Sequence, residues 1–251
     1  MADIATAPHS KPVPHDYDDG HSAHHWDPLT VAHRQLYHST RQPFLPIYQG
    51  SKIANPSALA FFSLAVGLYL LSMVALQVGD LTTLNIVVTV GLGYSGISLL
   101  VAGIWEFPSG NPFGAALYCT LSGFFVSLAI LLSPWSAVST AYATTEEFQQ
   151  AVGQFMFAFF ITVFVFLVAA HRSSGGLICA LTLIDLTVLF VGCYYYKPEN
   201  AKLLKAAGGF GIVAAFVCWY AALASLLTPH SSAFRLPVLY DFTRAQRKAS
   251  A

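Results

Sequence analysis

The sequence has little charge. Asp, Glu, Lys and Arg make up only 10% of its 251 residues, and 12 acidic and 12 basic residues leave a formal net charge of zero. Such a balance creates no extended basic field, so the composition does not favour nucleic acid as a partner. Hydrophobic residues reach 55%, and the mean hydropathy is +0.59. These values lie outside the range of typical soluble domains and indicate an integral membrane protein.

Cysteine is also scarce, and all four cysteines fall within apolar stretches of the sequence. Neither their spacing nor their surroundings fit a disulfide framework or a zinc site, so we interpret them as small packing residues. They are Cys119, Cys179, Cys193 and Cys218. The sequence therefore predicts no metal site and no cofactor in the apolar region.

The usual groupings of catalytic residues are missing as well. The chain has no His-Glu-x-x-His pair, and its apolar runs hold no second aspartate for a dyad and no Ser–His arrangement. Because an enzyme needs convergent polar groups, we predict no catalytic residue and no enzyme activity. A pore lined by apolar and small residues fits the composition better.

What the sequence does have is six long apolar runs. The first opens with Asn55-Pro56, a favourable helix cap followed by a proline pre-set for the first turn, and continues without charge over residues 58–76. About 20 such residues in a helix cross the roughly 30 Å core of a bilayer. The other runs are residues 86–105, 113–132, 151–170, 176–196 and 206–227. We expect an all-α membrane protein of six transmembrane helices in three helical hairpins, with a capping box at residues 144–147 opening the fourth helix.

Three regions follow from this pattern. Residues 1–54 form a polar N-terminal tail that we expect to be disordered, residues 55–229 the transmembrane domain, and residues 230–251 a C-terminal tail. The N-terminal tail holds seven of the nine histidines. A metal site there is an alternative, but the histidines lack paired ligand spacing, which favours a solvated tail.

Orientation is predicted by the basic residues. With six spans, both tails lie on one side together with the loops after the second and fourth spans, and that side carries nine of the twelve Lys and Arg residues. Basic residues are retained in the cytoplasm, so we expect both termini to be cytoplasmic. Lys197, Lys202 and Lys205, just before the sixth span, do not fit this rule.

Two stripes of small residues predict where helices pack closely. Gly93, Gly96 and Gly103 share one face of the second span, inside a Gly-x-Gly-x-x-Gly pattern that lacks the strand and acidic residue of a dinucleotide site. A similar stripe runs along the sixth span and includes Gly208 and Gly211. Small residues let membrane helices approach each other, so we interpret both stripes as packing faces.

Two acidic residues are candidates for a proton relay or gate. Asp185 is the only charged residue inside a span, where a charge costs about 2.5–3.5 kcal/mol on insertion scales. It is either such a relay or a packing residue, with Thr182 on the same helix face available to share a hydrogen bond. Glu106 ends the second span, near the helix N-termini at Asn55 and Asn111. Because helix N-termini bind carboxylates, this face is a candidate anion site.

The motifs around these residues resemble the acetate uptake transporter family. The similar segments are residues 52–59, residues 102–107 continuing into 110–114, residues 185–187, and residues 207–211 with Trp219-Tyr220. The resemblance implies six helices per protomer, a pore within each protomer, a hexamer and uptake of small carboxylates. It assigns substrate binding to Asn55, Pro56, Ser57, Leu59 and Asn111.

The same resemblance places a pore constriction at Leu64, Leu121 and Leu186, where the family has a Phe, a Tyr and a Leu. The sequence also departs from the family hallmark Asn-Pro-Ala-Pro-Leu-Gly at Ser57, Ala58 and Ala60. Three leucines form a hydrophobic gate without the phenolic hydroxyl.

We therefore expect a plasma-membrane transporter or channel for acetate and similar small monocarboxylates, including succinate as a candidate, coupled to protons. Its expected partners are the carboxylate, the lipid bilayer and further copies of the same chain. A membrane sensor or scaffold that does not transport, and ammonium export, are the alternatives. The sequence does not distinguish a channel from a proton symporter.

Overall fold

The computed structural model describes residues 54–80, 83–227 and 236. Most of the predicted N-terminal tail, with its histidines, and most of the C-terminal tail lie outside these residues. So do most of the basic residues on which the predicted orientation depends.

The described residues confirm six helices long and apolar enough to cross a membrane, and they contain no strand. One span is composite, because α3 (Asn85–Val90), η2 (Gly91–Gly96) and α4 (Ile97–Glu106) run on without interruption. The other spans are α2 (Ser57–Ala75), α5 (Pro112–Leu132), α6 (Thr145–Ala169), α7 (Gly175–Tyr196) and α8 (Ala201–Leu226). Single 3₁₀ turns stand in the connections at Val78–Asp80, Pro134–Ser136, Ser139–Ala141 and Ala170–Arg172.

Side-chain caps begin several of these helices as the sequence predicts. The Oδ1 of Asn111 accepts a hydrogen bond from the backbone N–H of Gly114 (3.0 Å), ahead of a proline at the first position of α5. The Thr144 hydroxyl accepts from the N–H of Glu147 (3.1 Å), and the Glu147 carboxylate accepts from the N–H of Ala143 (3.0 Å). The first bond confirms the Thr144 half of the capping box, whereas the return bond from Glu147 goes to the residue before the cap; α6 starts at Thr145, six residues before its apolar run.

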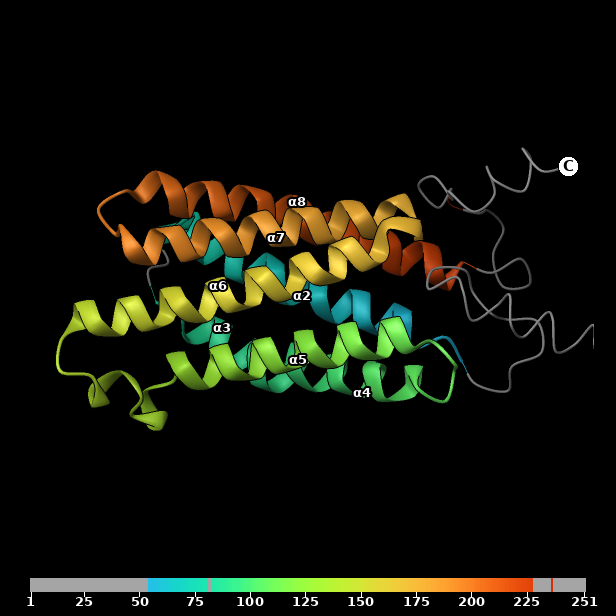
Figure 1. Cartoon of the computed structure of the whole chain (residues 1–251), viewed down its shortest axis with the longest axis horizontal. Helices are drawn as coiled ribbons and strands as arrows, with labels where there is room; N and C mark the ends of the chain where they lie inside the picture. The colour runs from blue at the N-terminus through green and yellow to red at the C-terminus, as the bar shows by residue number, and fades with distance from the viewer. Residues whose placement is uncertain (1–53, 81–82, 228–235, 237–251) are drawn as a thin grey trace, which may run out of the picture. The chain divides into compact units, whose positions relative to one another are not determined.

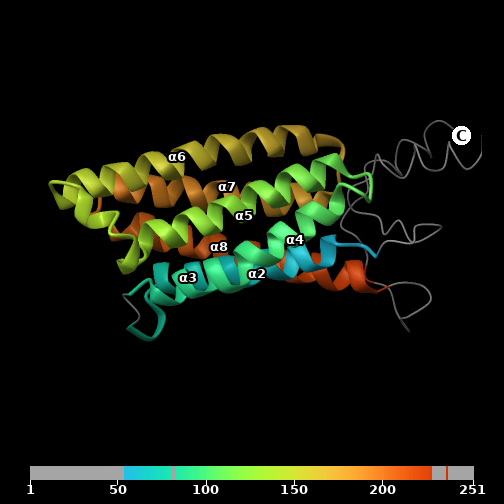
Figure 2. The same cartoon turned by 90° about the horizontal axis from the view of Figure 1, so that it is seen from below.

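The helices run alongside one another, and α6 lies on the side opposite α2, α3 and α4 (Figures 1 and 2). The most extensive helix pairings are α2 with α8, α6 with α7, α7 with α8, and α4 with α5. The first span therefore packs chiefly against the last. Between α5 and α6 the contact is made by aromatic side chains, since Phe124 stacks on Phe155 and meets Phe159 edge-on.

The second span contains a π-helical turn that the sequence analysis did not predict. Its six residues, Gly91–Gly96, are the Gly-x-Gly-x-x-Gly segment. The Ser122 hydroxyl of α5 donates to the Gly96 carbonyl (2.7 Å), and the Ser95 hydroxyl donates to the Ser63 carbonyl of α2 (2.8 Å). The turn is thus tied to both neighbouring helices. A π-turn of this kind is common at functional sites.

The predicted packing face of the second span is only partly right. A Cβ on Gly103 would lie 2.5 Å from the sulfur of Cys119 on α5, so this glycine does allow close packing. Gly93, by contrast, has nothing within 4 Å of the place its Cβ would take. A Cβ on Gly96 would lie 2.6 Å from the Val126 side chain of α5, so two of the three predicted positions pack closely, and only Gly93, inside the π-turn, is rotated off that face.

The stripe on the sixth span is confirmed. A Cβ on Gly208 would lie 2.7 Å from the Leu76 side chain and 3.0 Å from the Ser72 carbonyl, and one on Gly211 would collide with the Ser72 hydroxyl. Ala215 and Ala222 are fully buried. Small residues thus bring α8 against α2, as is usual for membrane helices.

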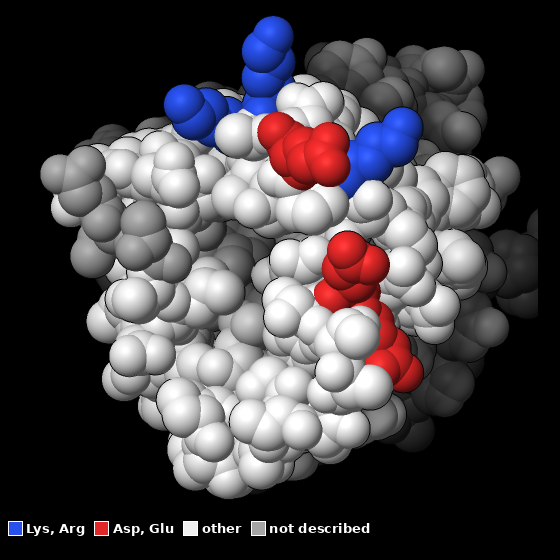
Figure 3. All heavy atoms as spheres, turned by 90° about the vertical axis from the view of Figure 1, so that its left-hand side faces the viewer, with Lys and Arg blue, Asp and Glu red and all other residues white. Residues whose placement is uncertain are grey.

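Charge is confined to a few places among the described residues. Figure 3 views the molecule from the end where α6 and α8 begin, and its charged side chains gather in one part of a largely uncharged surface. They include Glu146 and Glu147 at the start of α6 and three lysines, Lys197, Lys202 and Lys205, around the start of α8. The flanks of the helices are apolar; α6 exposes Ile161, Phe164, Val165 and Val168. An apolar flank is what contact with lipid requires.

Candidate functional site

A buried polar cluster joins the ends of three helices. Glu106, at the end of α4, is only 2% exposed, and its two carboxylate oxygens have different partners. Oε1 accepts from the Ser57 hydroxyl at the start of α2 (2.5 Å), and Oε2 accepts from the Asn111 amide that caps α5 (2.9 Å). Two of the residues predicted to bind substrate therefore already bind a carboxylate of the protein itself.

The other predicted binding residues lie around this cluster. Asn55 is half-buried, and its Oδ1 accepts from the backbone N–H of Ser57 (3.0 Å). The cap position of α2 is Pro56, however, so Asn55 stands one residue before the cap and the predicted cap is wrong by one residue. Pro56 is half-buried beside it. Leu59 is 39% exposed, so its side chain points away from the buried cluster.

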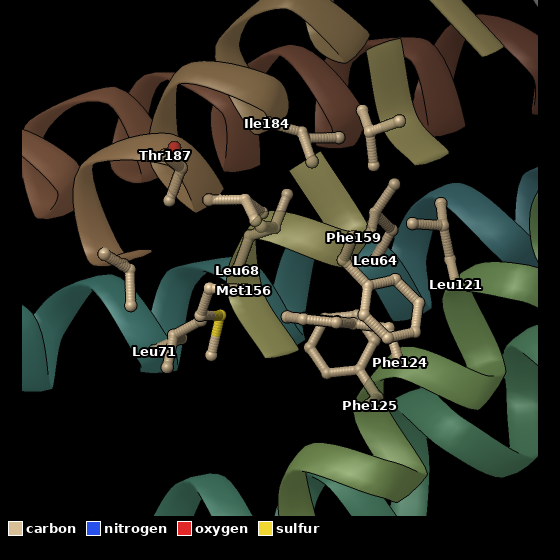
Figure 4. Close-up of a pocket in the computed structure, with 13 residues that line it drawn as sticks. Leu64, Leu68, Leu71, Leu121, Phe124, Phe125, Met156, Phe159, Ile184 and Thr187 are labelled. Atoms are coloured by element: carbon tan, nitrogen blue, oxygen red, sulfur yellow. The ribbon is translucent and has the colours of Figure 1, made fainter. Parts of the chain in front are cut away.

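An apolar cavity lies deeper in the molecule, between α2, α5, α6 and α7 (Figure 4). Its volume is about 20 Å³, which is room for roughly one water molecule. Its lining is entirely apolar except for Thr187, whose hydroxyl donates to the Leu183 carbonyl (2.7 Å). The lining residues are Leu64, Leu68, Leu71, Leu121, Phe124, Phe125, Met156, Phe159, Val163, Ile184, Thr187, Val188 and Val191.

The structure brings two of the three predicted constriction residues together. Leu64 of α2 and Leu121 of α5 are both buried and line the apolar cavity, near the rings of Phe124 and Phe159 (Figure 4). Leu186 of α7 is half-buried and is not among the lining residues. Along α7 the face toward the cavity is that of Ile184, Thr187, Val188 and Val191 instead.

Asp185 is 6% exposed in the middle of α7. Its Oδ1 is buried and has no hydrogen-bond partner among the described residues. The bond we expected with Thr182 is wrong, because the Thr182 hydroxyl donates to the Ile178 carbonyl one turn earlier (2.8 Å). A threonine in a helix readily bonds its own backbone in this way.

Sequence reasoning missed the aromatic half of the cavity. Phe124, Phe125, Phe155 and Phe159 form a connected group across α5 and α6, with ring centroids 4.9 to 5.9 Å apart. The signal was present, since Phe residues are dense in both apolar runs. Spacing within one run cannot show which rings of another run they meet.

Six membrane-spanning helices with an internal apolar cavity and a polar cluster at one end define a multi-pass membrane protein. The chain belongs to the GPR1/FUN34/yaaH family, whose model matches residues 37–240. Among solved structures it is similar in fold to the bacterial acetate channel SatP, with a TM-score of 0.66 and 21% sequence identity, covering 74% of this chain and 99% of that one.

Two fungal relatives carry names that describe transport. Acetate permease A of Emericella nidulans is 31% identical over 224 residues, which cover 80% of this chain and 75% of the relative. Ammonia transport outward protein 2 of Saccharomyces cerevisiae is 28% identical over 199 residues, which cover 79% of this chain and 70% of the relative.

Proposed function

We propose that this protein is a permease for acetate and similar small monocarboxylates, and not an enzyme. The observation that carries the proposal is the 31% identity with a protein named as an acetate permease, which extends over 80% of the chain. The similarity of fold to an acetate channel is consistent with it.

The geometry supports a path in two stages. At the end where α2 and α5 begin, the Ser57 hydroxyl and the Asn111 amide donate to the buried Glu106 carboxylate, so a substrate carboxylate would have to compete with Glu106 for these two donors. Beyond them the path crosses the apolar cavity at Leu64 and Leu121. A charged carboxylate there has nothing to replace its water, so the neutral acid crosses more easily.

The cavity of about 20 Å³ holds roughly one water molecule, which is less than an acetate needs. The described arrangement is therefore closed, and side chains around Leu64 and Leu121 move when an acid passes. Apolar constrictions of this kind gate by excluding water.

Further parts of the proposal concern the protein in its membrane. We place it in the plasma membrane with both termini cytoplasmic, as a hexamer with one pore in each protomer. Glu106 would act at the cytoplasmic mouth and Asp185 along α7, either as a relay of protons or in packing. Proton coupling accompanies uptake in this scheme.

Labelled-acetate uptake by the purified protein in liposomes, with and without a pH gradient, tests the function. We expect uptake above that of protein-free liposomes, increased when the outside is acidic. Uptake equal to protein-free liposomes in both conditions, from protein that is folded and inserted, would contradict the proposal.

Outward ammonia transport is the second candidate, because a relative with 28% identity is named for it. An apolar cavity also suits a small neutral molecule such as ammonia. The same liposomes loaded with ammonium distinguish the two functions, since an ammonia transporter would change the internal pH without carrying acetate.

A further inference from the structure

Phe125 of α5 lies directly on the backbone of α2. A Cβ on Gly67 would stand 2.5 Å from Cε1 and 2.6 Å from Cζ of the Phe125 ring. Carbon atoms in contact stay about 3.5–4.0 Å apart, so only a glycine lets the ring lie this close. Gly67 shares its helix face with Leu64 and Leu71, which line the apolar cavity. The ring therefore covers the one position on this face of α2 that has no side chain.

The π-turn packs against Gly67 and against the backbone of Phe125. The Ser95 hydroxyl, which donates to the Ser63 carbonyl, lies 2.6 Å from the place of a Gly67 Cβ. At the other end of the turn, a Cβ on Gly91 would lie 2.9 Å from the backbone oxygen of Phe125. Gly91 thus meets the backbone of Phe125, and Gly67 meets its ring.

Apart from its contacts with Gly67 and Phe124, the Phe125 side chain faces the apolar cavity. Its ring meets Phe124 edge-on, with centroids 5.5 Å apart and an interplanar angle of 75°. The residue is fully packed and at the same time lines the apolar cavity, beside Leu64 and Leu121 (Figure 4). How deeply the ring sinks onto Gly67 therefore determines how much space the cavity has.

We propose that Phe125, seated on Gly67, determines the longest carboxylic acid that the protein admits. The proposal rests on the function proposed above and assigns its chain-length selectivity to a residue outside the predicted constriction. One methylene in an apolar pocket changes discrimination by about 10–200-fold, so a shift of the ring is enough to move the cut-off by one carbon.

The test compares uptake of formate, acetate, propionate and butyrate by parent and Phe125→Leu in liposomes. Leucine is smaller than the ring, so we expect the butyrate-to-acetate ratio to rise about tenfold or more. Gly67→Ala pushes the ring off α2 and narrows the cavity, so acetate uptake falls while formate uptake falls less. Because the Ser95 hydroxyl also lies 2.6 Å from the place of the new methyl group, room for it needs both neighbours shortened, and in Gly67→Ala/Ser95→Ala/Phe125→Leu acetate uptake returns toward the parent value.

Gly123→Ala is the matched control. It lies on the same helix as Phe125, and nothing is within 4 Å of the place its Cβ would take, so its selectivity should equal that of the parent. Thermal unfolding of each purified variant identifies those that are not folded. If Gly67→Ala does not fold, the proposal is tested by the ratios of butyrate and propionate uptake to acetate uptake in Phe125→Leu alone.

Two results separate the possible failures. If the parent carries acetate but folded Phe125→Leu keeps the parent order and ratios of the four acids, the assignment of selectivity to Phe125 is wrong. If the parent carries none of the acids, the proposed permease function itself is wrong.

Discussion

Glu106 shows how a single residue can hold three helices. Its carboxylate is almost entirely buried and accepts from Ser57 on α2 and from the cap of α5, 49 and 5 residues away in sequence. Each oxygen has a donor, so its burial is compensated by hydrogen bonds. Bonds to a charged group are worth about 1.5–3 kcal/mol each, more than those between neutral groups.

Removing this carboxylate should destabilise the protein. Glu106→Ala leaves the buried donors of Ser57 and Asn111 without an acceptor, at about 1–3 kcal/mol each, so the unfolding temperature in detergent should fall clearly. Glu106→Gln keeps one acceptor and a similar shape and should lie between alanine and the parent. Glu146→Gln, on an exposed side chain, is the control. Equal stability of the alanine variant and the parent would show that the cluster does not hold the helix ends.

Asp185 differs from Glu106 because one of its oxygens is buried without a described partner. A charge at membrane depth costs about 2.5–3.5 kcal/mol on insertion scales, and Asp185→Asn removes that cost while keeping the size. We expect this variant to be stable and to retain acetate uptake with its response to a pH gradient. Loss of that response in a folded variant would identify Asp185 as a proton relay.

Leu121 lines the cavity at a position where a hydroxyl would change its chemistry. Leu121→Tyr supplies a donor to a lining that otherwise offers none to a passing acid, so uptake of the more polar lactate should increase relative to acetate. Competition of lactate against labelled acetate measures this ratio. An unchanged ratio in the folded variant would place Leu121 away from the path.

At the scale of the helix, the sequence predicts features that depend on residues nearby in the chain, such as spans and caps. It does not predict features that depend on contacts with other helices. Runs of about twenty apolar residues and the caps at Asn111 and Thr144 are local, and the structure has them. The π-turn changes the helical period itself, so Gly93 does not lie on the packing face predicted for it. Matching the flanking motifs gives Leu186 a position in the sequence, but it does not determine which face of α7 meets the cavity.

In the candidate site, too, the positions of residues could be predicted from the sequence but their contacts could not. Ser57, Glu106 and Asn111 could be assigned to one end of the bundle from the sequence, because each stands at the end of a predicted span. Their mutual hydrogen bonds could not, since these depend on the angles between α2, α4 and α5. The contact between the Phe125 ring and Gly67 joins residues 58 positions apart, so no pattern of neighbouring residues predicts it.

The pairing of α8 with α2 provides a test at this scale. Gly211→Ala puts a methyl group into the Ser72 hydroxyl and should cost about 1–3 kcal/mol by overpacking. Gly209→Ala, two residues away on the same helix, meets nothing within 4 Å and should be neutral or slightly stabilising. Thermal unfolding of the two variants gives the comparison. Equal effects would mean that α8 does not approach α2 as closely as described.

For the molecule as a whole, the closed apolar cavity predicts how flux depends on pH. If the neutral acid is the form that crosses, uptake should rise as the outside becomes more acidic. The neutral fraction of a simple carboxylic acid changes about tenfold per pH unit near neutrality, because carboxyl pKa values lie near 4. Uptake into liposomes at several pH values, corrected for protein-free liposomes, measures the slope.

Leu64→Ala separates the width of the path from the charge state of the acid that crosses it. The shorter side chain widens the cavity, so flux should increase at every pH while the slope stays the same. A slope that flattens in this variant would mean that the wider path admits the charged form. Flux that is independent of pH in the parent would rule out the neutral acid as the species that crosses.

The pairing of the first span with the last has a consequence for biosynthesis. Ribosomes add about 5–20 residues per second, and about 125 residues separate the end of α2 from the start of α8, so α2 waits roughly 6–25 s for its main partner. During that interval the buried hydroxyl of Ser72, which packs against Gly211 of α8, faces lipid or a temporary companion. A chain truncated before α8 would keep that surface open, which makes the nascent protein a natural client for insertion chaperones and for membrane quality control.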